Sequence, residues 1–338
     1  MKEEIATTLA SVGEFPLIRE FFQPLRLEGV AGVVAGIGDD AAVLAVPRTQ
    51  QLLATVDALI EGIHFSATDD PFLLGEKALR VNLSDIAAMG GRPNWYLLSV
   101  GLPGETPSQW LTEFTRGLRG CGERFGVTIV GGNTTGSPSG RTIHVTMFGL
   151  VGQGRALTRG VAEVGDRIFV TGTIGDATLG LAVRQGGLIG VDEADRRYLE
   201  GRLDLPEPRV DMGVALADAA AARGVIDVSD GLVADLGHIC TASGKGARLD
   251  VGRIPLSEAA RRLVLRDPAL MRRILTGGED YELLFTVAPG AVEMVHTLSG
   301  RVGVPVTEIG EIVAGAEVEV VAADGERLVL EQGGWRHF

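Results

Sequence analysis

Six short motifs place glycine beside carboxylate or hydroxyl residues at the edge of apolar segments. They are GIGDDAAVL at 36–44, ATVDALIEGIHF at 54–65, VNLSDIAAMGGRP at 81–93, IVGGNTTGSP at 129–138, IDVSDGLVADLGHI at 226–239 and TGGEDYELLFTV at 276–287. Mg²⁺ takes oxygen ligands and usually bridges carboxylates to phosphate oxygens. Several carboxylates in one cleft would repel one another unless cations neutralised them. The motifs therefore favour a Mg²⁺-dependent, phosphate-handling enzyme over acidity that serves solubility alone.

The candidate residues also have ordinary structural interpretations. Asp57 follows a buried apolar run, where it could bind a ligand in the crevice at a strand end or cap a helix. Asp85 lies within small, apolar helical residues, so its charge must be paired, capped or bound to metal. His64 alone could equally be a satisfied core or surface histidine. The number of acidic motifs, rather than any single one, indicates a cation site.

The motif GGNTTGSP reads as a loop between two strands. Its backbone N–H groups and threonine hydroxyls could hold a phosphate group. The chain has no Walker A sequence and no GxGxxG fingerprint between a strand and a helix. The sequence therefore predicts a nucleotide site of a different type.

Strands and helices alternate in both halves of the chain. In the first half, strands are expected at 51–56, 96–101, 127–130 and 142–150, and helices at 15–25, 71–80 and 108–125. Residues 84–89 either continue the helix at 71–80 or restart one, with Ser84 and Asp85 near its start. In the second half, strands are expected at 167–171, 248–251 and 281–287, and helices at 176–185, 210–223 and 232–243. A glycine-rich segment without periodicity at 150–165 separates the halves. We therefore predict an α/β fold of α+β type with two mixed domains, 1–150 and 151–338.

Composition narrows the classes of partner. The net charge is −13, which argues against nucleic acid and anionic membranes as bulk partners. Glycine accounts for 48 of 338 residues. This abundance indicates many tight turns or many places where the backbone approaches a ligand closely. Two cysteines, Cys121 and Cys240, form no disulfide framework, and the N-terminus has no signal-peptide pattern. We expect a cytoplasmic protein.

In these motifs the chain resembles the thiamine-monophosphate kinase family of the aminoimidazole-ribonucleotide synthetase superfamily. The resemblance also includes GEFPLI at 13–18, GRALTRG at 154–160, VTGTIGDATLGL at 170–181 and GGWRHF at 333–338. It implies ATP-dependent phosphorylation of thiamine phosphate to thiamine diphosphate by direct transfer, without a phosphoenzyme. It also implies a homodimer formed by the N-terminal domains, with the ATP site in a cleft covered by the second domain.

The resemblance also implies roles for individual residues. The expected Mg²⁺ ligands are Asp40, Thr55, Val56 through its carbonyl, Asp57, Asp85, Asn133, Asp227 and Asp230. The positions expected to contact ATP are Gly132, Asn133, Arg159 and Ser229. The positions expected to contact thiamine phosphate are His64, Glu279 and Trp335. No residue is expected to act as a general base, because the acceptor phosphate is already an anion.

Two positions depart from the family pattern. The family usually has Asp, a metal ligand, where this chain has Asn133, and often Arg where it has Gly136. An asparagine offers a carbonyl oxygen but no negative charge. One metal site could therefore be weaker, although the other acidic ligands are present.

Other functions fit the sequence less well. A selenophosphate synthetase would need a reactive residue near the N-terminus, and no cysteine precedes Cys121. The related hydrogenase-maturation proteins would end in cysteine, and aminoimidazole-ribonucleotide synthetases would not share GGWRHF. A non-catalytic module that binds metal or nucleotide is the alternative of a different class. A calcium-binding structural protein is disfavoured because EF-hand spacing is absent from the sequence.

Overall fold

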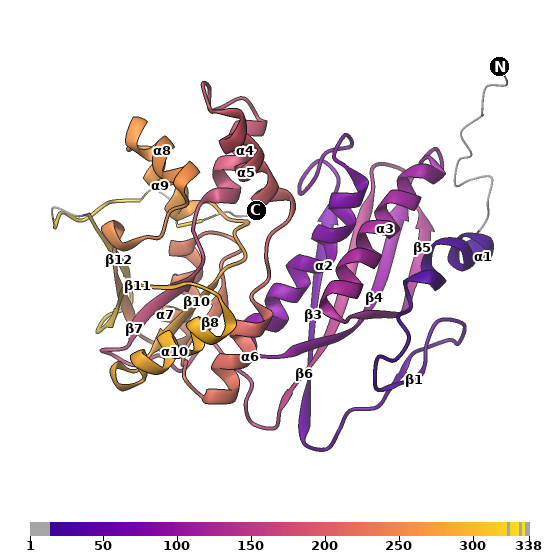
Figure 1. Ribbon diagram of the computed structural model, residues 1–338, viewed down its shortest axis with the longest axis horizontal. Helices are drawn as coiled ribbons and strands as arrows, with labels where there is room; N and C mark the ends of the chain where they lie inside the picture. Colours follow the sequence, from indigo (N-terminus) through magenta and orange to yellow (C-terminus); the bar gives the residue numbers. More distant parts are fainter. Residues whose placement is uncertain (1–13, 323–324, 331–332, 335–338) are drawn as a thin grey trace. The chain divides into compact units, whose positions relative to one another are not determined.

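The computed structural model describes residues 14–322, 325–330 and 333–334. Trp335 lies outside the described residues. The chain divides into two compact units, the first formed by residues up to Ile86 with Arg92–Leu150, the second by Ala87–Gly91 with Val151 onward. Each unit contains a mixed sheet and helices (Figure 1), which confirms the expected α/β class. None of the helices in the described part of the chain has both the length and the apolar character needed to cross a bilayer.

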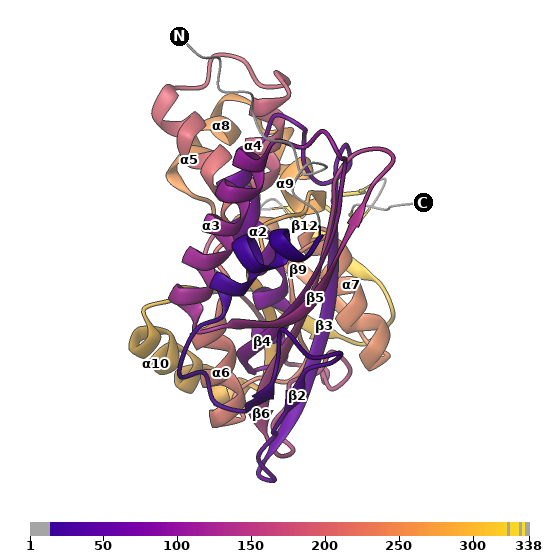
Figure 2. The same ribbon diagram turned by 90° about the vertical axis from the view of Figure 1, so that its right-hand side faces the viewer.

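The first unit is built on a four-stranded sheet in the order β3-β6-β4-β5. The strands are β3 (Gln50–Ile60), β4 (Arg92–Leu102), β5 (Thr128–Gly136) and β6 (Thr142–Gly152). β4 pairs parallel with β5 and antiparallel with β6. Helices α2 (Pro71–Ala88) and α3 (Ser108–Phe125) lie over one face of this sheet (Figure 2). Leu83 of α2 and Phe114 of α3 are fully buried there, so this face carries the core of the unit.

Smaller elements precede this sheet. The expected helix at 15–25 is divided into α1 (Glu14–Leu17), a π-helical turn (Ile18–Phe22) and a 3₁₀ turn (Gln23–Leu25). The short strands β1 (Val33–Ala35) and β2 (Val43–Leu44) pair antiparallel. The loop between them carries the acidic residues of GIGDD.

Three elements of the first unit differ from the sequence-based expectation. β3 continues to Ile60, so Asp57 lies inside a strand and not at its end. Residues 84–88 continue α2, which is one of the two expectations, but Asp85 lies in its last turn and not near a helix start. GGNTTG belongs to β5 and is not a loop, because residues from Gly131 to Gly136 pair with Leu97 to Leu102 of β4. A long neighbouring strand thus overrides the turn preference of glycine and asparagine.

The second unit contains a six-stranded sheet in the order β12-β9-β11-β7-β10-β8. The strands are β7 (Arg167–Thr171), β8 (Val225–Asp227), β9 (Gly246–Asp250), β10 (Leu283–Val287), β11 (Val306–Val313) and β12 (Val318–Val321). The pairs are antiparallel except that between β12 and β9.

Helices cover both faces of the second sheet. They are α4 (Asp176–Arg184), α5 (Glu193–Asp204), α6 (Val210–Ala219), α7 (Leu232–Ser243), α8 (Glu258–Arg266), α9 (Leu270–Thr276) and α10 (Val292–Val302), with 3₁₀ turns at Val251–Arg253 and Pro289–Ala291. Successive side chains of a strand point to opposite faces. Leu284 accordingly packs in the core that includes α7 and α9, and Phe285 in the core that includes α6 and α10. The edge strand β8 and its neighbour β10 belong to the acidic motifs at 226–239 and 276–287.

Candidate active site

In the first unit, one face of β3 presents a hydroxyl and a carboxylate toward α2. Leu53 and Leu59 are buried, so the side chains at alternate positions between them, Thr55 and Asp57, share the covered face and are half-buried. The Thr55 hydroxyl donates to Oδ2 of Asp85 at 2.5 Å. The structure thus brings Thr55 and Asp85 into contact and places Asp57 on the same face.

Two other expected metal ligands of this unit are more exposed. Asp40 is exposed in the loop between β1 and β2. The side chain of Val56 is 61% exposed on the opposite face of β3 from Asp57. Only its backbone carbonyl is a suitable metal ligand, as the family resemblance implied.

Gly132 and Asn133 lie on β5, beside β4. Asn133 is exposed and pairs with Ser99 in register. A Cβ atom at Gly132 would stand 2.0 Å from the carbonyl oxygen of Leu98, so only glycine fits here, just beyond the irregularity in the β4–β5 pairing. The geometry therefore requires glycine at 132 for strand packing, whatever else this position contacts.

His64 is held in a tight turn after β3. The Ile60 N–H donates to Nδ1 of His64 at 3.0 Å, and the His64 N–H donates to the Ile60 carbonyl at 2.9 Å. A ring nitrogen that accepts a hydrogen bond carries no proton. The neutral ring therefore carries its proton on Nε2, which is the atom suited to donate to a ligand.

In the second unit, Asp227 ends β8 and is 4% exposed. The next turn carries Ser229 and Asp230, both half-buried, and leads into α7. One carboxylate oxygen of Asp235, in the first turn of α7, accepts the backbone N–H groups of Ser229, Asp230 and Gly231, each at 3.1 Å. Burial raises the pKa of Asp235 to about 7, against the effect of these N–H groups, which favour the charged form. Asp235 thus fixes the turn that holds two expected ligands.

The segment before β10 runs beside this turn and brings Glu279 to it. The Glu279 N–H donates to the Ser229 carbonyl at 2.9 Å, and the Tyr281 N–H donates to the Val228 carbonyl at 2.8 Å. The backbone of Glu279 is left-handed, with φ of +75°, and that of Tyr281 with φ of +52°. Each such non-glycine residue costs about 1–2 kcal/mol. Asp227, Ser229, Asp230 and Glu279 are therefore gathered on two neighbouring segments of the second unit.

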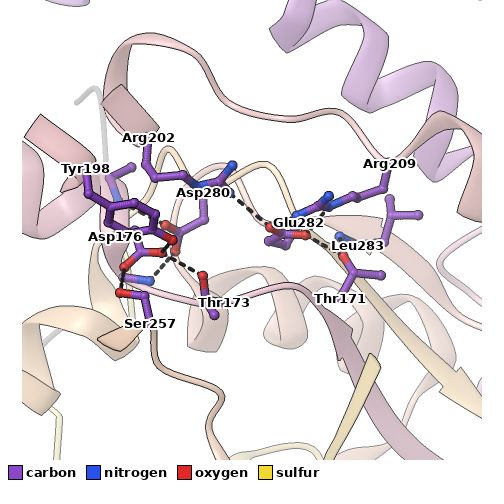
Figure 3. Close-up of polar contacts among 12 residues, drawn as sticks. Thr171, Thr173, Asp176, Tyr198, Arg202, Arg209, Ser257, Asp280, Glu282 and Leu283 are labelled. Atoms are coloured by element: carbon purple, nitrogen blue, oxygen red, sulfur yellow. Dashed lines mark hydrogen bonds and ion pairs between the residues drawn. The ribbon is translucent and has the colours of Figure 1, made fainter. Parts of the chain in front are cut away.

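A polar network centred on the buried carboxylate of Glu282 adjoins these segments (Figure 3). The Glu282 carboxylate, which is fully buried, accepts two hydrogen bonds of 2.6 Å from Arg209, one of 3.0 Å from Arg202 and one of 2.7 Å from Thr171. Glu282 also accepts the Val228 N–H at its backbone carbonyl, at 2.8 Å. The network therefore connects α5 and the start of α6 to the strand end that carries Asp227.

A second group of polar contacts, formed by Asp280 and Asp176, surrounds the start of α4 (Figure 3). Asp280 is 1% exposed and accepts the N–H groups of Gly175 at 2.7 Å and Ala177 at 3.3 Å. Burial raises the pKa of Asp280 to about 8. Asp176 accepts hydroxyl hydrogen bonds from Ser257 at 2.5 Å and Thr173 at 2.6 Å. These contacts hold the glycine-rich turn before α4 against the segment that carries Glu279.

Arg159 lies in a loop of the second unit and is exposed. Its backbone carbonyl accepts the Ser243 hydroxyl at 3.2 Å, which fixes the loop against the end of α7. This hydrogen bond therefore fixes the backbone that carries the Arg159 guanidinium group.

The expected residues therefore form two sets, one in each unit. Within the residues that the structure describes, no group of three or more His, Cys, Asp or Glu side chains could hold a metal ion. The donors present are nevertheless hard oxygen atoms in pairs, Thr55 with Asp85 and Asp227 near Asp230. Such pairs fit Mg²⁺, which keeps several waters and phosphate oxygens among its ligands.

Sequence reasoning missed four residues that shape the second set: Asp235, Asp280, Glu282 and Arg209. All but Arg209 lie inside the motifs at 226–239 and 276–287. A signal was available for Asp235, an acid within an otherwise apolar helical run. For Glu282 and Arg209 there was no local signal, because the partners are 73 residues apart.

Comparison with known proteins identifies the family. The chain matches the family models described as AIR synthase related protein, N-terminal domain, over residues 38–151, and C-terminal domain, over residues 163–323. It is 43% identical over 326 residues to the thiamine-monophosphate kinase of Escherichia coli strain K12, covering 96% of this chain and 98% of that protein. The chain belongs to the thiamine-monophosphate kinase family.

Solved structures agree with this assignment to the thiamine-monophosphate kinases. The crystal structure of the enzyme from Stenotrophomonas maltophilia K279a superposes with a TM-score of 0.82 at 41% identity, covering 94% of this chain and 98% of that one. A structure described as AaThiL complexed with AMPPCP and TMP superposes with a TM-score of 0.76 at 31% identity, covering 99% and 100%. The expected family and fold class are confirmed.

Proposed function

We propose that this chain transfers the γ-phosphoryl group of ATP to thiamine phosphate and releases ADP and thiamine diphosphate. The observation that carries the proposal is the likeness over nearly the whole chain to AaThiL, a protein solved with AMPPCP and TMP together. AMPPCP replaces the bridging oxygen of ATP with carbon, so it occupies a nucleotide site without reacting. The acidic segments at 227–231 and 277–282 carry carboxylates that cations could bridge to the phosphates of these reactants.

The metal and nucleotide would be held mainly by oxygen donors. The Mg²⁺ ligands that we propose are Asp40, Thr55, the Val56 carbonyl, Asp57, Asp85, Asn133, Asp227 and Asp230. When bound, Mg²⁺ would offset the charge of the phosphates and orient them. For ATP we propose contacts from Gly132, Asn133, Arg159 and Ser229, with the Arg159 guanidinium giving paired donors to phosphate oxygens.

The acceptor would be held by His64, Glu279 and Trp335. The Nε2 proton of His64 is suited to a phosphate oxygen, since Nδ1 already accepts from Ile60. The Glu279 carboxylate complements the positive charge of a thiazolium ring. His64 therefore suits the phosphate of thiamine phosphate, and Glu279 suits its thiazolium ring.

The chemistry needs positioning more than proton transfer. An oxygen of the acceptor phosphate attacks the γ-phosphorus, the bond from that phosphorus to the bridging oxygen breaks, and the leaving oxygen remains on ADP. The acceptor is already ionised near neutral pH, so no general base is required. The residues named above bind and align two anions and lower their repulsion, which is the main task in phosphoryl transfer.

We also propose a homodimer formed through the first unit. On β3 and β2 the side chains of Leu52, Val56 and Val43 are 46%, 61% and 52% exposed. β2 and β3 belong to different sheets of the first unit, and exposed apolar side chains on both favour a surface that a partner covers. Light scattering of the purified protein tests this, with twice the chain mass expected.

A cytoplasmic location is part of the same proposal. Both cysteines, Cys121 and Cys240, are free thiols and buried. Free thiols suit a reducing compartment.

A turnover assay tests the function. ADP formation is measured with ATP, Mg²⁺ and thiamine phosphate, and the phosphorylated product is identified by mass spectrometry. Unphosphorylated thiamine serves as the control and should give no product, because it lacks the acceptor phosphate. Binding of ATP without any ADP formation would support the non-catalytic alternative.

A further inference from the structure

The segment from Gly277 to Glu282 has an unusual backbone conformation. Glu279 and Tyr281 both have left-handed backbones, and the residue between them, Asp280, is almost fully buried. Non-glycine residues persist in this conformation only where the surrounding structure enforces it. The contacts that enforce it should therefore be visible on either side of Glu279.

One restraint is the carboxyl group of Asp280. It accepts the N–H groups of Gly175 and Ala177, at 2.7 and 3.3 Å, where the glycine-rich turn enters α4. α4 begins at Asp176 and packs in the core of the second unit through Leu179 and Val183. Asp280 is thus fixed to a rigid element of the same unit.

The other restraints act on Glu279 itself. Its N–H is bound to the Ser229 carbonyl at 2.9 Å, and the Tyr281 hydroxyl lies 3.4 Å from its Oε1. Release of Asp280 would let both left-handed residues relax toward ordinary backbone angles. The Glu279 carboxylate would then move away from its position beside Ser229.

We propose that Asp280 is a positioning residue that holds Glu279 in its left-handed conformation and thereby sets the affinity for thiamine phosphate. The role assigned to Glu279 rests on the proposed function. The prediction that Asp280 controls the conformation of residues 277–282 does not depend on it.

The kinetic test compares Asp280→Ala and Asp280→Asn with the wild type. The alanine variant should raise KM for thiamine phosphate about tenfold or more and leave KM for ATP within about twofold, because a displaced substrate contact affects one substrate. The asparagine variant keeps a carbonyl oxygen for Gly175 and should recover most of the affinity. It also remains informative if the alanine variant does not fold.

Asp166→Asn is the matched control. Asp166 is also 1% exposed and also accepts a backbone N–H group, that of Glu163 at 2.9 Å, but it lies just before β7. This variant should lower stability without changing either KM. Equal changes in both KM values for the Asp280 variants, or the same change in Asp166→Asn, would overturn the proposal.

A double variant tests the route through Glu279. Glu279→Ala alone should raise KM for thiamine phosphate, and adding Asp280→Ala should raise it no further, since the carboxylate being positioned is gone. Additive increases would mean that Asp280 acts by another route.

Hydrogen exchange gives a readout that needs no turnover. Amide exchange across residues 277–282 should be faster in Asp280→Ala than in the wild type and unchanged in Asp166→Asn. Unchanged exchange in Asp280→Ala would refute the positioning role. If the wild type failed to phosphorylate thiamine phosphate while this exchange difference was present, the proposed function would fail and the conformational role would stand.

Discussion

The guanidinium group of Arg209 binds both carboxylate oxygens of Glu282, from Nε to Oε2 and from Nη2 to Oε1, each at 2.6 Å. This bidentate pair joins the residue before α6 to the residue before β10. Glu282 is fully buried, so its charge depends on this partner and on Arg202. The strand end that carries Asp227 is thereby attached to a rigid part of the second unit.

Arg209→Ala should lower the free energy of unfolding by about 3 kcal/mol, because it leaves a buried carboxylate without its main partner. Urea denaturation of the purified protein measures this. Arg116→Ala is the control, since Arg116 and its partner Glu113 are 63% and 34% exposed and such pairs contribute about 1 kcal/mol or less. Equal losses in the two variants would contradict this account.

Asp57→Asn should reduce turnover by more than about 100-fold while the melting temperature stays near that of the wild type. The substitution keeps the shape of a half-buried side chain and removes its charge. Asp218→Asn, at an exposed position of α6, makes the same change of net charge and should leave turnover unaffected. Retention of most activity by Asp57→Asn would refute the metal assignment.

Asn133→Asp should lower the Mg²⁺ concentration for half-maximal activity about fivefold, because an added charge near a cation contributes about 1 kcal/mol at 4 Å in water. Asn133 is exposed, so stability should not change. Thr135→Asp places the same charge two residues along β5, on the same face, and should have a smaller effect. Mn²⁺ binding followed by electron paramagnetic resonance provides a measure independent of turnover.

Gly278→Ala should disturb the contact between the two acidic segments. A Cβ atom there would lie 2.0 Å from the Ser229 carbonyl oxygen, so the segments must separate. We expect a loss of about 1–3 kcal/mol in stability and a higher KM for both substrates. Gly300→Ala in α10 meets no atom within 4 Å and should not destabilise the protein. Thermal melting of both variants measures the change in stability, and steady-state kinetics measures the two KM values.

Asp280 should make stability fall as pH rises. Burial raises its folded-state pKa from 3.8 to about 8, so between these values the folded protein binds a proton that the unfolded chain has released. Its contribution is complete below the unfolded pKa, declines as pH rises through this window, and is lost above about pH 8. Unfolding free energies at pH 5 and pH 8 should therefore differ less in Asp280→Asn than in the wild type. An equal pH dependence in both would show that Asp280 does not titrate in this range.

Local patterns predicted the helices well where the apolar period was strong. α3 and α7 have the bounds expected from the sequence, 108–125 and 232–243. The apolar spacing of α3 and the glycine after each helix carry that information locally. The acidic motifs and their order along the chain were likewise sufficient to indicate the family.

Features that depend on distant partners could not be read from the sequence. Glycine and asparagine in GGNTTG favour a turn, yet β4 holds them in a strand. The contact between Asp280 and Gly175 spans 105 residues, and nothing near either residue indicates the other. The sequence therefore identified which acids could serve a site, and the fold was needed to show which acids hold the others in place.

The three hydrogen bonds that Asp235 accepts affect how the turn before α7 can receive an anion. Backbone N–H groups at the start of a helix commonly bind phosphate directly. Here those of Ser229, Asp230 and Gly231 are already satisfied by a carboxylate of the protein. A bare phosphate would meet an acidic surface at this turn with its donors taken. Under the proposed function, this turn would favour a nucleotide that arrives with its cations over metal-free nucleotide and inorganic phosphate.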